Sequence, residues 1–320
     1  MSVKVLFFGT AEFTIPILAK IKENFNLIGV VCQPDKRKGR KYQLQPPPAK
    51  IWAEKNNISV YQPITLKDEK VIEQIKNFYP DIIVTAAYGK ILPKSILDIP
   101  PYGCLNIHAS LLPKYRGAAP INWAIFNGEK KTGITIILMD EGMDTGPIII
   151  QQKLDILDED NAITLSKKLS KLGAELLVKI LPLWIKKEIT PMPQDDTKAT
   201  YAPLLKKENG LIKWEWDSEK IINHIRAFVP WPGSFTFFRN KKIILEEVEN
   251  FNKYIVETSL EPGKIIKILK KEGPIVATGN GGVLVKKLKI ENKKTILGKD
   301  FLNGYRIIPG EKFTDSKVDV

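Results

Sequence analysis

The stretch "VKVLFFGTAEFTIPILAKIKEN", from Val3 to Asn24, sets the fold of the first part of the chain. Its beginning, Val3–Thr10, is a short apolar run rich in β-forming residues, and the rest carries apolar residues at helical spacing. A short buried strand followed at once by a helix is the repeating unit of a parallel sheet with crossover helices. The chain is therefore predicted to open an α/β domain with a Rossmann-like, mostly parallel sheet.

The same alternation of apolar runs and helical stretches continues to about Lys187. The long last helix contains Pro182, which lacks the N–H that a helix interior uses, so a kink is predicted there. Further strands are predicted at residues 27–33, 81–89, 104–109 and 133–140, and further helices at residues 48–56, 68–78, 119–128 and 164–187.

The character of the sequence changes after Lys187. Pro, Asp and Thr accumulate over residues 188–207, which predicts a linker. Over residues 208–320 the apolar period is closer to two, between Gly and Asn turns, which predicts a small C-terminal β-barrel of the OB-like kind. Residues 1–187 are thus predicted to be a separate N-terminal domain. Strands of the barrel are predicted at residues 234–239, 241–249, 273–278, 281–290 and 299–307.

The composition is that of a soluble globular protein with an excess of positive charge. Of 320 residues, 43% are hydrophobic and 27% are charged, and 49 Lys+Arg against 36 Asp+Glu give a net charge of +13. A positive net charge of this size creates an electric field that concentrates polyanions around the protein, so nucleic acid is one candidate partner. The alternative explanation for the excess of positive charge is a proteome that is rich in lysine. No apolar run reaches the roughly 18 residues that span a bilayer, and no signal peptide is recognisable. A soluble protein without a membrane partner is predicted.

The two cysteines, Cys32 and Cys104, lie far apart in the sequence, and neither belongs to a Cys-x-x-Cys or Cys/His pattern. This spacing predicts neither a zinc site nor a disulfide framework. A reducing cytoplasm fits this use of cysteine, so we expect a cytoplasmic protein.

A cluster of positive charge follows the second predicted strand. The segment "DKRKGRKY", Asp35–Tyr42, carries basic residues around a glycine, and the stiff "PPP" of Pro46–Pro48 comes soon after it. A charged run is usually a solvated face. Here the position at the C-terminal edge of a parallel sheet also suits a mobile basic loop that reaches over an anionic substrate.

The strongest candidate site lies in "LNIHASLLPKYRGAAP", Leu105–Pro120, together with "MDEGMDTG", Met139–Gly146. Asn106 and His108 are two apart on a predicted strand, so their side chains share one side. The next strand follows a single crossover and is expected to run parallel to the first, so its end should deliver Asp144 to the same edge of the sheet.

An amide, an imidazole and a carboxylate suit acyl transfer between two bound substrates. Asn106 could donate to a developing oxyanion, His108 could pass a proton to the leaving amine, and Asp144 could orient the imidazole ring. A single histidine at a strand end is also commonly structural. Ser110 lacks a Gly-x-Ser-x-Gly elbow, which disfavours a serine hydrolase, and a metal site needs more ligands than these residues supply.

These motifs resemble the signature of the formyltransferases that use 10-formyltetrahydrofolate. Asn-x-His-x-Ser-Leu-Leu-Pro together with "MDEGMDTG" carries that resemblance, and the outer motifs are similar to the methionyl-tRNA branch of the family. The outer motifs are "FFGTAEF" at 7–13, "QPDKRKGR" at 33–40, "AAYGKILP" at 86–93, "TYAPLLKKENGLIKW" at 200–214 and "IRAFVPWPGSF" at 225–235.

The resemblance implies a formyl donor site and a catalytic trio in the domain 1–187. Asn106, His108 and Asp144 take the catalytic roles. The donor, 10-formyltetrahydrofolate, is expected against the "SLLP" segment, with Tyr88 and Gly89 lining the pterin pocket and no metal involved. The residues of that segment are Ser110, Leu111, Leu112 and Pro113.

The resemblance also implies initiator methionyl-tRNA as the second substrate and a monomeric protein. The acceptor end is expected to contact the basic loop, the barrel of residues 208–320 to hold the acceptor arm, and Phe13 to line the methionyl pocket. The basic residues concerned are Arg37, Lys38, Arg40 and Lys41.

Three alternatives remain at the sequence level. The nearest is a formyltransferase that acts on an amino sugar nucleotide, which shares the catalytic motif but has no need of an extended cationic surface. A catalytically idle nucleic-acid-binding protein fits the charge but not the intact trio. Hydrolysis of formylfolate fits the trio but not the barrel or the basic loop.

Overall fold

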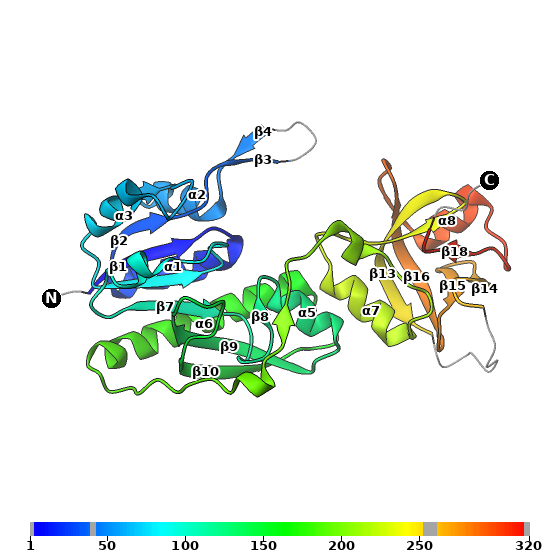
Figure 1. Ribbon diagram of the computed structural model, residues 1–320. Helices are drawn as coiled ribbons and strands as arrows, with labels where there is room; N and C mark the ends of the chain where they lie inside the picture. Colours follow the sequence, from blue (N-terminus) through cyan, green and yellow to red (C-terminus); the bar gives the residue numbers. More distant parts are fainter. Residues whose placement is uncertain (1–2, 39–42, 252–260, 317–320) are drawn as a thin grey trace. The chain divides into compact units, whose positions relative to one another are not determined.

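The computed structural model describes residues 3–38, 43–251 and 261–316. Contacts divide the chain into two compact units (Figure 1). The first consists of residues 1–120, 130–156 and 164–203, and the second of residues 121–129, 157–163 and 204–320. No helix of the described residues is long and apolar enough to cross a bilayer.

The first unit is built on a seven-stranded sheet in the order β10-β9-β7-β6-β1-β2-β5. Five of these strands are parallel, which confirms the predicted Rossmann-like, mostly parallel sheet. The strands are β1 (Lys4–Gly9), β2 (Asn26–Val31), β5 (Val60–Tyr61), β6 (Ile82–Ala86), β7 (Cys104–His108), β9 (Lys131–Leu138) and β10 (Ile148–Asp155). The helices are α1 (Ile15–Asn24), α2 (Pro48–Lys55), α3 (Glu69–Lys76), α4 (Lys94–Leu97) and α6 (Ala162–Ile185), with the 3-10 turn η1 (Glu12–Thr14) before α1.

The sequence of β1 is a continuous apolar run because this strand lies inside the sheet, between β6 and β2. Val5, Leu6, Phe7 and Phe8 are all 0% exposed, because a parallel strand with helices on both faces buries both sets of side chains. The carboxyl ends of β1, β2, β6 and β7 consequently share one edge of the sheet.

One sequence prediction about this sheet is wrong. Strand β9 was expected to run parallel to β7, but it is antiparallel, with Leu105 opposite Leu138 and His108 opposite Thr135. The one helix in the connection, residues 109–130, is the seven-residue α5 (Pro120–Phe126), about 10 Å long at 1.5 Å per residue. A chain that returns to the starting edge must span a strand of about 27 Å, at 3.4 Å for each residue of β9. The chain therefore turns back beside β7, and β10 is antiparallel to β9 in turn.

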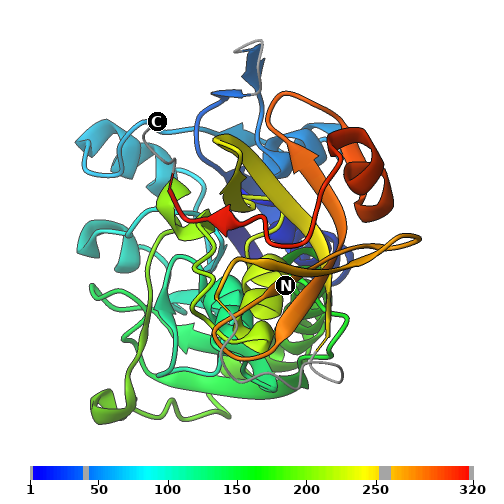
Figure 2. The ribbon, with the colours of Figure 1, turned by 90° about the vertical axis from the view of Figure 1, so that its right-hand side faces the viewer.

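The basic segment forms a hairpin where the sequence predicted a loop. β3 (Lys36–Lys38) pairs antiparallel with β4 (Gln43–Gln45), and Pro48 then begins α2. Residues 39–42, with Arg40 and Lys41, lie outside the described residues. The hairpin projects from the rest of its unit in both views (Figures 1 and 2).

The segment after α6 belongs to the first unit as far as residue 203. It forms a bridge between Met192 and Ile148, the 3-10 turn η2 (Asp196–Lys198) and the short strand β11 (Tyr201–Ala202). β11 pairs in parallel with β8 (Arg116–Gly117), which follows the Asn-x-His motif. These contacts hold the segment against the region that carries the candidate site.

The second unit is an antiparallel sheet that curls into a half-barrel (Figures 1 and 2). The strand order is β14-β15-β16-β13-β12-β18, and β17 pairs with β16. The strands are β12 (Ser234–Phe238), β13 (Lys241–Asn250), β14 (Ile265–Leu269), β15 (Gly273–Ala277), β16 (Gly282–Ile290), β17 (Thr295–Leu297) and β18 (Phe313–Thr314). The 3-10 turn η3 (Lys207–Gly210) and the helices α7 (Ser218–Ala227) and α8 (Gly298–Tyr305) complete the unit, together with most of α5.

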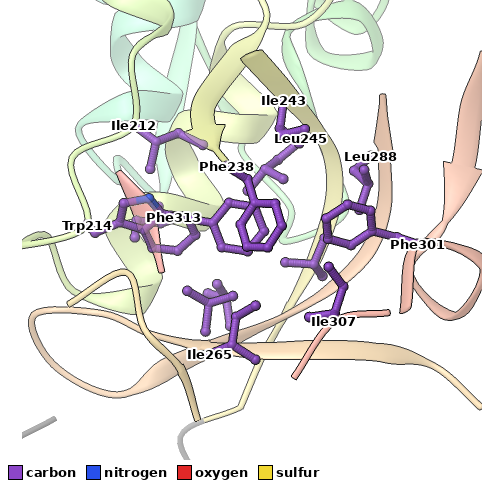
Figure 3. Packing of buried hydrophobic residues seen from close by; sticks show 14 of the residues in the cluster. Ile212, Trp214, Phe238, Ile243, Leu245, Ile265, Leu288, Phe301, Ile307 and Phe313 are labelled. Atoms are coloured by element: carbon purple, nitrogen blue, oxygen red, sulfur yellow. The ribbon is translucent and has the colours of Figure 1, made fainter. Parts of the chain in front are cut away.

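Aromatic side chains form the centre of the half-barrel core (Figure 3). The ring of Phe313 lies 4.9 Å from Phe238 and 5.6 Å from Trp214, measured between centroids. Phe301, at 5.5 Å from Phe238, brings α8 onto the same cluster. The interior of the sheet is therefore filled by side chains.

The helix α8 corrects another prediction, because residues 299–307 were expected to form a strand. Phe301 and Leu302 are buried and Tyr305 packs against the core. This spacing of i, i+1 and i+4 places the three side chains on one helical face, whereas a strand would separate them onto two faces.

His224 is a fully buried histidine in α7 and is ordered by hydrogen bonds. Its Nε2 lies 2.8 Å from the carbonyl of Asn209 and its Nδ1 lies 2.8 Å from Ser234 Oγ. A carbonyl only accepts, so Nε2 carries a proton, and Ser234 Oγ also lies 3.1 Å from the carbonyl of His224. Burial lowers the pKa of His224 to about 4.

We predict that His224 makes stability fall as the pH drops from about 6.5 to about 4. In this window the unfolded histidine binds a proton and the folded one does not, so acid favours unfolding by up to about 3 kcal/mol. Urea unfolding of the intact chain at several pH values, compared with His224→Gln, isolates this effect. The stability difference between the two proteins should be constant above pH 7 and should shrink in acid; a constant difference throughout would contradict the prediction.

Candidate active site

Asn106, His108 and Asp144 meet at one carboxylate. Asn106 Nδ2 donates to Asp144 Oδ1 at 3.1 Å, and His108 Nδ1 lies 3.5 Å from the same oxygen. The second oxygen, Asp144 Oδ2, accepts the backbone N–H of Gly117 at 2.8 Å. The side chains of His108 and Asp144 are 6% and 13% exposed. The structure thus brings the three predicted residues together in a nearly enclosed position.

The amide of Asn106 has one defined orientation. Thr85 Oγ1, on the neighbouring strand β6, donates to Asn106 Oδ1 at 2.9 Å. Because that oxygen faces a donor, the NH₂ group must face Asp144. One N–H is used by Asp144, and the other N–H of the same group can serve a substrate oxygen.

The imidazole of His108 is held from both sides. Nε2 lies 2.9 Å from the carbonyl of Tyr115, so this nitrogen carries a proton. Nδ1 faces Asp144 at 3.5 Å, longer than a good hydrogen bond. Catalytic hydrogen bonds are often long before substrates bind, so this contact between the imidazole and the carboxylate is short enough to tighten in a substrate complex.

Asp144 reaches this position through a loop that doubles back after β9. Its φ is 58°, in the left-handed region that costs an L-residue roughly 1–2 kcal/mol. The loop closes where Leu138 N donates to the carbonyl of Pro147 at 3.0 Å. At Gly146 the chain passes so close that an added Cβ would lie 1.9 Å from the carbonyl oxygen of Leu138. A tight, strained turn therefore brings Asp144 to Asn106 and His108, a placement that was expected from the end of a parallel strand.

The "SLLP" segment is closed by its own hydrogen bonds. Ser110 Oγ donates to the carbonyl of Lys114 at 2.6 Å, and Ser110 is 0% exposed. Thr135 Oγ1 donates to the carbonyl of Ser110 at 2.6 Å and accepts from Leu112 N at 3.1 Å. Leu112 is buried, while Leu111 and Pro113 are partly exposed. Only the latter two present side-chain surface on this segment.

Tyr88 and Gly89 follow β6 at the same edge of the sheet. The Tyr88 ring is buried against Phe8, and its hydroxyl has no hydrogen-bond partner among the described residues. Burial raises the pKa of Tyr88. Its carbonyl accepts from Thr10 Oγ1 and Gln33 Nε2, both at 3.1 Å, which ties together the loops after β1, β2 and β6.

The basic hairpin is anchored at its base, before Arg37 and Lys38. Asp35 accepts Lys50 Nζ at 2.9 and 3.0 Å and Gln62 Nε2 at 2.8 Å. Hydrogen bonds from Gln62 and Lys50 lower the pKa of Asp35. The carboxylate therefore ties the base of the hairpin to α2 and to Gln62.

Phe13 lies in the 3-10 turn η1 and is partly buried, and its carbonyl accepts from Ser170 Oγ on α6. This contact fixes the backbone of Phe13 within the first unit. It does not link Phe13 to the carboxylate of Asp144.

A cavity of about 460 Å³ opens where β9 ends and the Asp144 loop begins. Its lining includes Cys104, Leu138, Met139 and Glu141. The sulfur of Met139 also lies 3.3 Å from Thr85 Oγ1, so the cavity wall contacts the residue that orients Asn106. Among the described residues, no group of three His, Cys, Asp or Glu side chains could hold a metal ion.

Several residues of this site were missed in the sequence. Thr85, Gly117 and Gln194 bond to the trio or to its loop from positions far along the chain. Thr85 and Gln194 lie outside the motif, and no periodicity marks them. Gly117 stands inside the quoted "YRG", where a backbone N–H donor leaves no trace in the residue type.

We predict that Gly146→Ala destabilises the first unit by at least about 2 kcal/mol, because the methyl group must displace the Leu138 backbone. Urea unfolding of the intact chain measures the effect. Gly304→Ala is the matched control: it adds the same methyl in α8, where nothing lies within 4 Å. Equal stability of the two variants would show that the turn is not tight.

Two family models match the chain. The one described as formyl transferase covers residues 1–181, and the one described as formyl transferase, C-terminal domain, covers residues 204–306. Among solved structures, HypX from Aquifex aeolicus in complex with tetrahydrofolic acid is similar, with a TM-score of 0.65 and 16% identity over 98% of this chain and 49% of that one. WlaRD, described as a sugar 3N-formyl transferase, gives 0.66 and 20% over 92% and 100%. At these identities the likeness shows the fold alone.

Much greater identity is found with curated relatives. Methionyl-tRNA formyltransferase of Dictyoglomus thermophilum is 47% identical over 311 residues, which are 97% of this chain and 99% of the relative. The protein of the same name from Geobacter sulfurreducens is 41% identical over 314 residues, 98% and 97% of the two chains. The chain therefore belongs to the formyltransferase family, in the branch of the methionyl-tRNA formyltransferases.

Proposed function

We propose that the protein transfers a formyl group from 10-formyltetrahydrofolate to the α-amino group of methionyl initiator tRNA, for translation initiation. The observation that carries this proposal is the meeting of Asn106 and His108 at the Asp144 carboxylate. The chain that carries these three residues is 47% identical, along almost its whole length, to the methionyl-tRNA formyltransferase of Dictyoglomus thermophilum. We expect the enzyme to act as a cytoplasmic monomer.

In the proposed reaction the α-amine attacks the formyl carbon, and the bond from that carbon to N10 of the folate then breaks. An α-amine has a reference pKa of about 8, so a useful fraction is neutral near pH 7. The second N–H of Asn106 donates to the oxyanion of the tetrahedral intermediate. The His108 imidazolium gives a proton to N10 as it leaves, Asp144 holds the ring, and the proton lost by the attacking amine passes to solvent.

We propose that the folate lies along the "SLLP" segment and reaches the cavity beside the Asp144 loop. Leu111 and Pro113 offer apolar surface to the folate. Gly89, which is exposed and follows β6, adds no side chain that would occupy the space beside it. The cavity lining combines Leu138 and Met139 with the polar loop 140–142, which suits a flat heterocycle with polar edges.

We further propose that the basic hairpin binds the acceptor end of the tRNA. Arg37 and Lys38 lie on β3, which follows the anchored Asp35. Phe13 is proposed to contact the methionyl side chain. The C-terminal half-barrel is proposed to hold the acceptor arm.

Asn106→Ala and His108→Ala are each expected to lower kcat by a factor of roughly 100 to 1000, because each removes a donor to charge that develops in the transition state. Formyl transfer to methionyl-tRNA measures the rate, and filter binding of the tRNA should be unchanged. A rate near that of the wild type in either variant would contradict the assignment.

Arg37→Ala and Lys38→Ala are expected to raise the KM for methionyl-tRNA with little change in kcat. Each lost phosphate contact should also reduce the slope of log Kd against log salt by about one. Lys76→Ala, at the exposed end of α3, is the matched control for a lost surface charge. A control that weakens binding as much as the hairpin variants would count against the hairpin.

The same labelled donor separates this function from its nearest rival. With methionyl-tRNA, uncharged tRNA and an amino sugar nucleotide offered separately, label should appear only on methionyl-tRNA. Label on the sugar alone would overturn the proposed acceptor.

A further inference from the structure

The segment of the first unit that follows α6 carries a glutamine, Gln194, whose side-chain amide binds the Asp144 loop. Gln194 Nε2 donates to the carbonyl of Asp144 at 2.8 Å and to the carbonyl of Gly146 at 2.7 Å. Both N–H groups of one amide therefore bind the backbone of the turn that presents the catalytic carboxylate.

A buried arginine determines which way this amide faces. Arg116, 3% exposed, donates to Gln194 Oε1 through Nη2 at 2.8 Å and through Nε at 3.2 Å. A guanidinium only donates and a backbone carbonyl only accepts, so the amide has a single orientation that satisfies both sides. Arg116 also pairs with Asp196 at 2.7 Å, but Asp196 is 80% exposed, so that ion pair is screened by solvent.

The carboxylate and the backbone of Asp144 are thus both held by β8, one directly and the other through Gln194. Gly117 N binds the carboxylate directly at 2.8 Å, and the adjacent Arg116 holds the backbone through Gln194. β8 contains both residues and is itself fixed by pairing with β11. The left-handed backbone conformation of Asp144 is unfavourable for an L-residue. It is maintained because hydrogen bonds hold both the backbone carbonyl and the side-chain carboxylate of Asp144.

We infer that Gln194 is a positioning residue for formyl transfer: oriented by Arg116, it holds Asp144 where its carboxylate meets Asn106 and His108. The inference rests on the proposed function. It adds that formyl transfer requires a residue of the segment after Lys187, outside the predicted catalytic domain of residues 1–187. Gln194 acts through Asp144, because its amide is taken up by the two loop carbonyls and by Arg116. Its loss should therefore matter only while the Asp144 carboxylate is present.

A double-mutant cycle on the full chain tests this dependence. Gln194→Met, which keeps the length of the side chain but removes its hydrogen bonds, is expected to lower kcat by about 10- to 100-fold. The KM values for 10-formyltetrahydrofolate and methionyl-tRNA should change by less than about threefold, since neither is proposed to touch Gln194. In an Asp144→Ala background the same substitution should cost less than about threefold.

Two further variants make the result decisive. Asp196→Ala removes only the exposed ion pair of the same network, and its kcat should stay within about twofold of the wild type. Gln194→Glu has the shape of the native side chain and replaces Gln194→Met if that variant does not fold. It loses both N–H donors to the loop and should show the same fall in kcat.

A kcat within about twofold of the wild type in the Gln194 variants would overturn the inference, and so would an equal loss with and without the Asp144 carboxylate. Failure of the proposed function is a separate result, because the wild-type chain would then transfer no formyl group to methionyl-tRNA.

Discussion

The backbone turn at Asp144 is the constraint on which the site depends. Asn106 and His108 lie on a central strand and would keep their places in any well-packed sheet, whereas Asp144 lies in a loop with a left-handed backbone. The carboxylate accepts from Asn106 and from Gly117, and the backbone carbonyl accepts from Gln194. Rigid strands therefore provide two groups of the trio, and a network of hydrogen bonds provides the third.

The unexpected direction of β9 is the reason for this arrangement. Had β9 been parallel to β7, a strand end alone would have delivered the carboxylate. Because β9 runs back beside β7, its end lies opposite Leu105, toward the start of that strand. The chain must then double back to reach His108, and the close passage at Gly146 and the strain at Asp144 follow from that requirement.

The sequence was sufficient for the elements that bury apolar side chains periodically. β1, β6 and β7 appear where apolar runs predicted them, and Asn106 and His108 face the same carboxylate, as their spacing of two predicted, while Asp144 joins them through a turn and not through the predicted parallel strand end. The sequence alone was insufficient to predict features that depend on three-dimensional packing. The antiparallel β9 depends on the shortness of the helix α5 that precedes it, and the helix α8 depends on a face that only tertiary packing reveals. Thr85 and Gln194 could not be found from sequence, because their contacts are long-range and their side chains are common surface types.

The pairing of β11 with β8 bears on where the catalytic part of the chain ends. The sheet and its helices finish with α6 at Ile185, and a fragment cut there would keep every residue of the trio. It would lack Gln194 and the β11 strand that fixes Arg116 and Gly117. The shortest fragment that retains the complete hydrogen-bond network around Asp144 therefore extends through Ala202, so the segment after α6 is itself a part of the active-site scaffold.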